Sequence, residues 1–508
     1  MKTIKLFMMA ALALMTAACS SDDNDITTPT PQPVKPEGIP FSATIESESA
    51  TTRTLTEDTD NNTIKAAWKT GEKVALIYTV NNTKQFVVAE VTANGDGSAT
   101  INATLTDSPA DGTPVKIVYP ASAVDETNKE VKDLTTLLSE QSGELTNISD
   151  KYDLREATGK LKIGEETASL KESVRLNSTL AILKVQATIP YNSSTTFEFN
   201  SLTITIDGTK YVNIEKSSGS AQNSFYVALP PVSGGKVSFL AKDDKGRMFG
   251  YSKSGVTFEA GKYYQSTLKM MGAFSVGAEK KVCFSQGNLQ YNGSKWLFAE
   301  NQWGILDYNG TYNTSSKYPI DLFTWGNTTL GAEDYMGTEY DAYSSTLSNT
   351  IAQGTTGSDW GYNAISNGGN KNSQWRTLTI SEWQYLLTER TVNGGKGVSH
   401  SYTVGQSIGG INGLVIYPDG YTGDMYSGSN WATFEKNGCV FLPAGGYRNG
   451  QNVTSHSTSG YYWSADPLNG TYASYMSFEN SNNPSFPTTT TGEVNKDKGY
   501  SVRLVRDL

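Results

Sequence analysis

The sequence has few of the residues that build metal sites, disulfide frameworks and nucleophilic centres. Among its 508 residues there are 3 cysteines and 2 histidines. Three cysteines in so long a chain do not form a disulfide framework, and no pair stands at the spacing of a structural zinc site. His400 and His456 lie in polar stretches without the pattern of a nucleophile elbow, and we expect them to be solvated loop residues. No catalytic residue, metal or cofactor is therefore predicted, and the chain is expected not to be an enzyme.

Positive charge and long hydrophobic runs are also scarce. The net charge is −10 at pH 7 and is spread along the chain, so the sequence offers no basic patch to nucleic acid. The apolar run at residues 6–15 follows Lys2 and Lys5. It is shorter than the roughly 20 residues that a membrane-spanning helix needs. This pattern predicts a removable secretion signal.

Cys19 directly follows three small residues at the end of this signal. The arrangement resembles the lipobox of bacterial lipoproteins, and the acidic residues 20–25 resemble the tag that directs Bacteroidetes lipoproteins to the outer face of the outer membrane. The resemblance implies that residues 1–19 are a signal peptide, that Cys19 carries a lipid such as palmitate, and that the protein is surface-exposed on the cell outer membrane. The alternative is an ordinary cleaved signal with an incidental cysteine. Residues 20–37, acidic and then rich in Pro and Thr, are predicted to form a flexible linker.

The residues that the chain has in abundance favour antiparallel β-structure. There are 48 glycines and 28 tyrosines, and the length suits roughly two to four domains. Short runs of β-branched and aromatic residues, separated by turn residues and without intervening helices, predict two β-sandwiches, at residues 38–165 and 166–272. The clearest runs are residues 74–78, 86–91, 115–119, 180–185, 202–206 and 225–229.

The two cysteines beyond the signal, Cys283 and Cys439, lie in apolar, strand-like stretches. Cysteine in such surroundings usually packs as a small buried side chain. We therefore predict two buried thiols, and a disulfide between them is the alternative.

A series of short motifs in the first 270 residues resembles the Bacteroidales fimbrillins. The resemblance implies two fimbrillin-type, transthyretin-like β-sandwiches and assembly with other fimbrial subunits by strand addition. It also implies proteolytic processing at Arg53, which frees a fimbrillin from its lipidated leader and opens a groove for a neighbour's strand. An ordinary surface arginine is the alternative. The motifs are FSA at 41–43, TTRT at 51–54, WKTGEKV at 68–74, IVYP at 117–120, YDLR at 152–155 and FEAGKYY at 258–264.

Residues 273–508 contain most of the tryptophans and resemble the major paralogous domain of Fibrobacter and Bacteroides surface lipoproteins. That domain is similar to the C-type-lectin and formylglycine-generating-enzyme folds, and the resemblance implies an α+β domain. Such enzymes use a close pair of copper-binding cysteines, and the surroundings of Cys283 and Cys439 do not resemble a reactive thiol site. The motifs are FSQGNLQY at 284–291, DLFTWG at 321–326, WRTLT at 375–379, FLPAGGYR at 441–448, GYYWSA at 460–465 and GYSVRLVR at 499–506.

One helix is predicted in this third segment, over residues 380–390. Ser381 is placed to cap it, and Trp383, Leu386 and Leu387 share one face.

Aromatic and amide side chains crowd into the C-terminal part of the third segment. Aromatic rings stack on sugars or protein surfaces, while Asn, Asp and Ser supply adaptable hydrogen bonds. Trp463 is assigned to the core, and a calcium site is not predicted because only part of the lectin calcium motif is present. The candidate ligand-binding residues are Tyr447, Arg448, Tyr461, Asp466, Tyr472, Tyr475 and Asn480.

The sequence as a whole predicts a mainly β surface lipoprotein with a lectin-like head. Residues 270–272 run directly into the third domain, where a fimbrillin is expected to end in a donor strand. We therefore expect a fimbrial tip or accessory adhesin whose head binds a glycan or a host or bacterial surface protein. The alternatives are a surface enzyme acting on glycans, for which no carboxylate pair stands out, and a non-polymerising lipoprotein with the sandwiches as a stalk.

Overall fold

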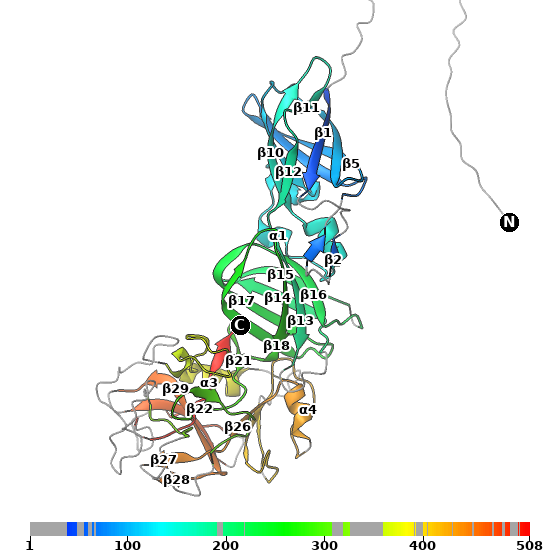
Figure 1. Ribbon diagram of the computed structural model, residues 1–508. Coiled ribbons are helices and arrows are strands. Elements are labelled where there is room, and N and C mark those ends of the chain that lie inside the picture. Colours follow the sequence, from blue (N-terminus) through cyan, green and yellow to red (C-terminus); the bar gives the residue numbers. More distant parts are fainter. Residues whose placement is uncertain are drawn as a thin grey trace, which may run out of the picture.

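The protein consists of three bodies stacked end to end (Figure 1). The predicted residues Cys19, Arg53 and Asn480 and the linker 20–37 lie outside the described residues. This computed structural model describes residues 38–47, 55–58, 63–65, 68–189, 197–217, 219–306, 319–325, 359–390, 392, 400–403, 405–428, 430–449, 452–469, 472–479, 483–487, 496 and 498–508.

The first domain is one sheet of eight strands that closes on itself. Its order is β11-β1-β12-β10-β7-β4-β5-β6, and a further pairing of β1 with β6 closes the ring. Alternating apolar side chains, such as Leu76 and Ile117, fill the interior. The expected sandwich is therefore a closed sheet. The strands are β1 (Ile39–Ser47), β4 (Lys73–Val80), β5 (Thr83–Ala93), β6 (Ser98–Leu105), β7 (Pro114–Tyr119), β10 (Arg155–Ile163), β11 (Ala168–Leu170) and β12 (Val174–Ser178).

Short elements join the first domain to the second. Their apolar side chains form one cluster with Leu180 and Ala228 of the second domain, so the junction has a core of its own. The elements are β2 (Thr56–Asp58), β3 (Thr63–Lys65), η1 (Ala121–Ala123), β8 (Val124–Asp125), β9 (Glu130–Val131), α1 (Leu134–Leu137), α2 (Leu145–Asn147) and η2 (Ile148–Tyr152).

The second domain is a β-sandwich, as predicted. One sheet has the order β16-β13-β19, and β15-β14-β17-β18 belong to the other. Side chains of both sheets, such as Val185 and Phe239, share one core. The predicted boundary at 165/166 is wrong, because β11 and β12 pair with β1 and β10 of the first domain. The strands are β13 (Ala181–Thr188), β14 (Ser201–Ile206), β15 (Thr209–Glu215), β16 (Ser224–Leu229), β17 (Val232–Lys242), β18 (Met248–Phe258) and β19 (Tyr263–Lys269).

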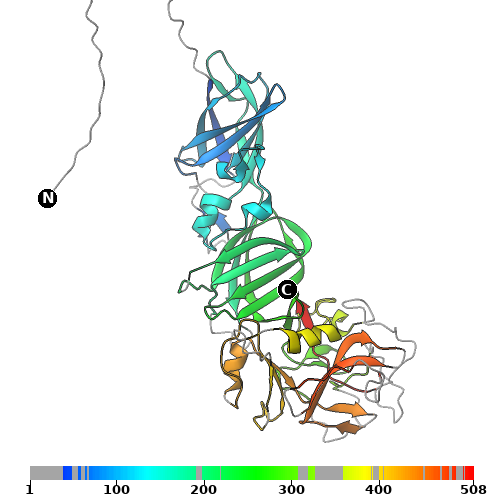
Figure 2. The same ribbon diagram turned by 180° about the vertical axis from the view of Figure 1, so that it is seen from behind.

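The larger sheet of the second domain continues into the third. After β18 it adds β20 (Met271–Ser275), β21 (Lys281–Phe284) and β31 (Val505–Asp507). The predicted boundary at 272/273 therefore lies inside β20. The C-terminal end of the chain returns to this junction, as both views show (Figures 1 and 2).

The third domain mixes short strands with short helices around two main apolar clusters and a smaller one. No described helix has the length and apolar character that a membrane span requires. The elements are β22 (Leu289–Tyr291), β23 (Trp296–Phe298), η3 (Trp360–Tyr362), α3 (Ile380–Gln384), η4 (Tyr385–Glu389), β24 (His400–Tyr402), β25 (Gly413–Ile416), α4 (Trp431–Lys436), β26 (Val440–Pro443), β27 (Tyr447–Asn449), β28 (Asn452–Thr454), β29 (Ser459–Pro467) and β30 (Ala473–Glu479).

The predicted helix at 380–390 is confirmed in position but begins differently. Its N-cap is Thr379, not Ser381, and Thr379 forms a capping box with Glu382. The second half, η4, winds as a π-helix. Trp383 is buried in one cluster with Leu386 and Leu387, as their spacing predicts.

Two close backbone contacts fix the third domain against the second. A Cβ on Gly272 would lie 2.0 Å from the carbonyl oxygen of Gly438, and one on Gly420 would lie 1.9 Å from that of Gly246. The amide of Met248 also donates to the carbonyl of Asp419 at 2.9 Å. The two domains therefore pack backbone to backbone.

We predict that Gly272→Ala loosens this junction. The carbonyl of Gly438 belongs to the backbone and cannot move aside cheaply, so the free energy of unfolding should fall by about 1–3 kcal/mol. Urea unfolding followed by tryptophan fluorescence measures this, because every tryptophan except Trp68 lies in the third domain. The control is Gly277→Ala, whose new Cβ would meet its nearest neighbour at 3.4 Å. Equal stability of the two variants would contradict the prediction.

Candidate functional site

The first strand among the described residues, β1, lies between neighbouring strands of the first domain's sheet. β1 pairs antiparallel with β6 from Ile39, opposite Leu105, to Glu46, opposite Ser98. On its other side it pairs parallel with β12 and β11. Its alternate side chains point into the barrel and are buried, so β1 contributes both backbone hydrogen bonds and core. These side chains are Phe41, Ala43 and Ile45.

A single carboxylate attaches the next segment of the chain to the second domain. Glu57 of β2 accepts hydrogen bonds from Lys184 Nζ at 2.7 and 2.9 Å, from Tyr263 Oη at 2.6 Å and from Gln265 Nε2 at 3.0 Å. Tyr226 Oη donates to it as well. The donors come from β13, β16 and β19, which form the three-stranded sheet. We call this group the Glu57 clamp.

The Glu57 clamp changes the acidity of its carboxyl group. The Glu57 side chain is 13% exposed. Burial raises its pKa, but the hydrogen bonds from Lys184, Tyr226 and Tyr263 outweigh burial and lower the pKa to about 2. The carboxylate is thus held in its charged form, which accepts strong hydrogen bonds.

The tyrosines predicted to bind a ligand form part of the core. Tyr461 and Tyr475 are each 3% exposed and belong to the same apolar cluster as Trp463, whose predicted core position is confirmed. Tyr447 packs edge-on against Tyr461 at 5.1 Å between ring centroids. Tyr472 is half-buried against the same cluster. Both faces of β29 are covered, so these rings do not form an open face.

The predicted polar ligand residues are also built into the fold. Arg448 is buried, and its backbone pairs with Gly499. Asp466 is half-buried and accepts a hydrogen bond from the amide of Ile380 at the start of α3. Burial raises the pKa of Asp466. Arg448, Tyr461 and Tyr475 are therefore removed from the candidate ligand surface, because little of their side chains is accessible.

The cysteines and histidines take structural positions. Cys283 and Cys439 are free and buried, which confirms the predicted thiols. Cys283 Sγ donates to the carbonyl of Gly250 at 3.2 Å. His400 is buried in β24, so its predicted place in a solvated loop is wrong. His456 is half-buried. Within the described ranges, no group of three or more His, Cys, Asp or Glu is arranged to hold a metal ion.

The Glu57 clamp has no signal in the sequence. Glu57 sits in a polar stretch of ordinary composition, and its partners follow it by more than a hundred residues. Only the pairing of β13 with β16 and β19 brings the four donors together.

Comparison with known proteins gives a family model for part of the third domain and several similar structures. Residues 427–505 match a domain of unknown function, DUF8237. No curated protein matches the chain. A fimbrial protein from Bacteroides ovatus is 13% identical, with a TM-score of 0.25, over 92% of this chain and 99% of that chain.

Two further solved structures are similar over about half of this chain. A putative cell adhesion protein from Bacteroides uniformis is 12% identical with a TM-score of 0.27, covering 47% of this chain and 94% of that one. The tip fimbrial protein Mfa3 from Porphyromonas gingivalis, with a C-terminal truncation, is 12% identical with a TM-score of 0.22, covering 45% and 94%.

We predict that Glu57→Gln weakens the first junction in a pH-dependent way. Because the folded pKa of about 2 lies below the usual 4.5, the carboxylate stabilises the fold above pH 4.5, and this contribution is lost as the pH falls through 2. Removing the charge should therefore lower the free energy of unfolding by about 1–3 kcal/mol at pH 7, and by much less near pH 2, where half of the wild-type carboxyl groups are protonated. Urea unfolding at both pH values measures the difference. Glu90→Gln, at an exposed position of β5, is the control. If Glu57→Gln lowered the free energy of unfolding by the same amount at both pH values, the prediction would be contradicted.

We also predict that neither buried thiol reacts while the protein is folded. Burial raises the pKa of Cys283 to about 12 and raises that of Cys439 further, so almost no thiolate forms at pH 8. Iodoacetamide followed by peptide mass mapping should label both positions only after unfolding in urea. Rapid labelling of either cysteine in the folded protein would contradict this.

Proposed function

We propose that this protein is a surface lipoprotein that serves as a tip or accessory subunit of a fimbrium and presents its third domain as an adhesin. In this proposal Cys19 carries the lipid that holds the protein in the outer membrane during export. Arg53 is the processing site, and the third domain binds a glycan or a surface protein. The support comes from the fimbrillin-like motifs and from the way the first and last strands are built into their sheets.

The position of β1 supports assembly by strand addition. β1 precedes Arg53 in the chain, so a cut there separates β1 from everything that follows. Loss of β1 would leave the edges of β6 and β12 unpaired and the sites of Phe41 and Ile45 empty. A strand from another subunit restores both the backbone hydrogen bonds and the buried apolar contacts. The Glu57 clamp keeps the segment after Arg53 on the second domain throughout.

The proposed position at the tip rests on one observation, which is where the segment after β19 pairs. β20 does not leave the second domain as a free strand. It pairs with β18 and β21, and β21 pairs with β31 at the end of the chain. A fimbrillin is expected to donate this segment, so a subunit that keeps it in its own sheet would accept a strand without passing one on and would end a filament. The third domain then lies at the outermost point, where recognition takes place.

The experiment is to produce Arg53→Ala in a fimbriated host and follow the protein in sheared fimbriae by immunoblot. The wild-type protein should appear in the fimbrial fraction as a shortened form, and the variant should stay with the membrane at full length. Lys210→Ala, at an exposed position of β15 and away from the edges of β6 and β12, is the control and should behave as the wild type. The proposal would be overturned if Arg53→Ala had the same size as the wild-type protein and the wild-type protein were absent from the fimbrial fraction. Turnover in a glycoside hydrolase screen, lost on substitution of one carboxylate, would instead favour the enzyme.

A further inference from the structure

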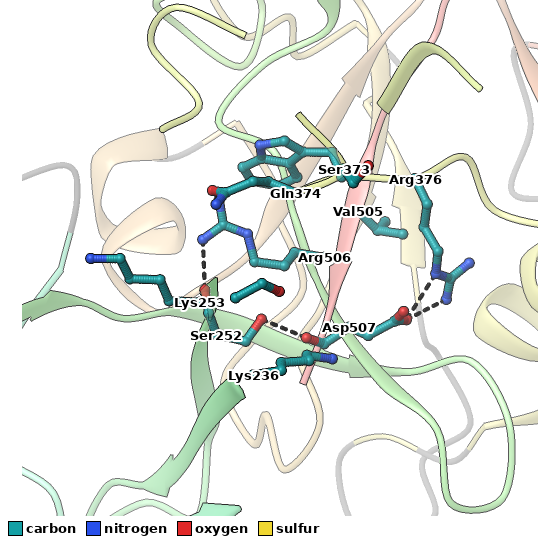
Figure 3. A pocket seen from close by; sticks show the side chains of 11 residues that line it. Lys236, Ser252, Lys253, Ser373, Gln374, Arg376, Val505, Arg506 and Asp507 are labelled. Atoms are coloured by element: carbon teal, nitrogen blue, oxygen red, sulfur yellow. Dashed lines mark hydrogen bonds and ion pairs between the residues drawn. The ribbon is translucent and has the colours of Figure 1, made fainter. Parts of the chain in front are cut away.

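A polar cavity lies between the second and third domains, and none of the predicted tyrosines lines it (Figure 3). Its volume is about 190 Å³. β17 and β18 form one wall, the segment before α3 forms another, and β31 crosses between them. β17, β18 and β31 belong to the shared sheet, and the backbone bridge of Arg376 with Val505 attaches the segment before α3 to it. The cavity therefore lies where the two domains meet.

The charged side chains that line the cavity are mostly cationic. Lys236, Lys253, Arg376 and Arg506 face a single acid, Asp507. Asp507 is already committed, since its Oδ1 accepts from Arg376 Nη2 at 2.6 Å and from Nε at 2.8 Å. Figure 3 shows Asp507 turned toward Arg376 and away from Arg506. Across the described ranges, the two lysines and Arg506 form no ion pair.

Arg506 is held in place without a neutralising partner. Its Nη1 donates to the carbonyl of Ser252 at 2.9 Å, and its Nη2 donates to the carbonyl of Gly368 at 3.3 Å. The guanidinium lies 4.3 Å from the centroid of the Trp375 ring. These contacts fix the orientation of the group but leave its charge uncompensated. Burial accordingly lowers the pKa of Arg506.

Lys236 reinforces the same positive site. Burial lowers the pKa of Lys236, and the nearby charges of Arg376 and Arg506 lower it further, against the opposing effect of Asp507. Two partly buried cations close enough to affect each other are costly for the folded state. A bound anion would remove this cost.

We propose that this cavity binds the carboxylate of an acidic sugar residue. Lys236 and Arg506 receive the carboxylate, and Lys253 adds positive charge at the mouth. The cavity is open to solvent, and its volume exceeds the roughly 150 Å³ that accommodates a benzene ring, so it admits the carboxylate end of a pyranose while the rest of the ring lies at the mouth. The hydroxyls of Ser254 and Ser373 and the amide of Gln374 line the same space and offer partners to sugar hydroxyls.

This inference rests on the proposed role in surface recognition and names the chemistry of the ligand. It places the site at the base of the head, between two domains, where binding sites often lie. The site needs no fimbria to form, so solution binding tests it separately from assembly.

The test is isothermal titration calorimetry of the full chain with glucuronate, its neutral methyl ester, and acetate as probes. Glucuronate should bind, and both the ester and acetate should bind at least about tenfold more weakly, because each lacks one half of the recognised group. The double variant Lys236→Gln/Lys253→Gln should weaken glucuronate binding by about tenfold or more. Lys242→Gln, exposed on the same strand as Lys236 but outside the cavity, is the matched control. Tryptophan-monitored unfolding verifies that each variant folds.

Each result that contradicts the proposal rules out a different part of it. Equal affinity for glucuronate and its ester would overturn the role of the carboxylate, and equal affinity for acetate would reduce the site to a bare anion site. If Lys242→Gln lost as much affinity for glucuronate as the double variant, or if the wild-type protein did not bind glucuronate, the cavity would not be the binding site. Incorporation into fimbriae, tested through Arg53, is unaffected by any of these results.

Discussion

The pairing of β31 with β21 is the interaction on which the position of the third domain depends. It places the last strand of the chain in the sheet that begins in the second domain, with Val282 opposite Asp507. Arg376 then joins Asp507 to Glu382 at the start of α3, through ion pairs of 2.6 and 2.7 Å. Because the sheet is continuous, the two domains cannot rotate against each other without breaking backbone hydrogen bonds.

Buried charge adds to this backbone connection. Asp419 lies at the same junction and pairs with Arg390 at 3.0 Å and with Lys281, while its backbone bonds to Ala273 and Met248. Burial raises the pKa of Asp419, but the charges of Arg390 and Lys281 outweigh burial and lower it. Removing one member of such a group leaves the other charges buried and unpaired, which is strongly destabilising. The junction thus combines a continuous sheet with a fully paired acid.

The first junction is built differently. There the attachment is a hairpin, a small apolar cluster and one carboxylate with several donors from a neighbouring sheet. A side-chain clamp of this kind holds its segment firmly at neutral pH, yet it does not make one sheet of two domains. Among the described residues, the sheet of the first domain shares no strand with either sheet of the second.

The sequence predicts the strands far better than it predicts what they pack against. Runs of apolar and β-branched residues such as Val74–Tyr78 became strands, whereas β11 and β12 are short and find their places by pairing with β1 and β10. The tyrosines near Trp463 were expected on an open surface, because a Tyr- and Asn-rich composition suits a binding face. That composition equally suits a strand with both faces covered, which is what β29 is. Glu57 and Lys236 give no local signal, since their partners lie far away in the chain.

The junction between the second and third domains contains two kinds of buried charge, acids that are paired with cations and cations that are not paired with acids. Asp419 and Glu382 are surrounded by cations and contribute to stability. Lys236 and Arg506 lie close by, are partly desolvated, and have no carboxylate of their own among the described residues. A junction selected for stability alone would pair them, as it pairs Arg376 and Arg390, or replace them with apolar side chains. Costly, unpaired charge in a preformed cavity is the pattern expected where a protein gives up stability to bind something.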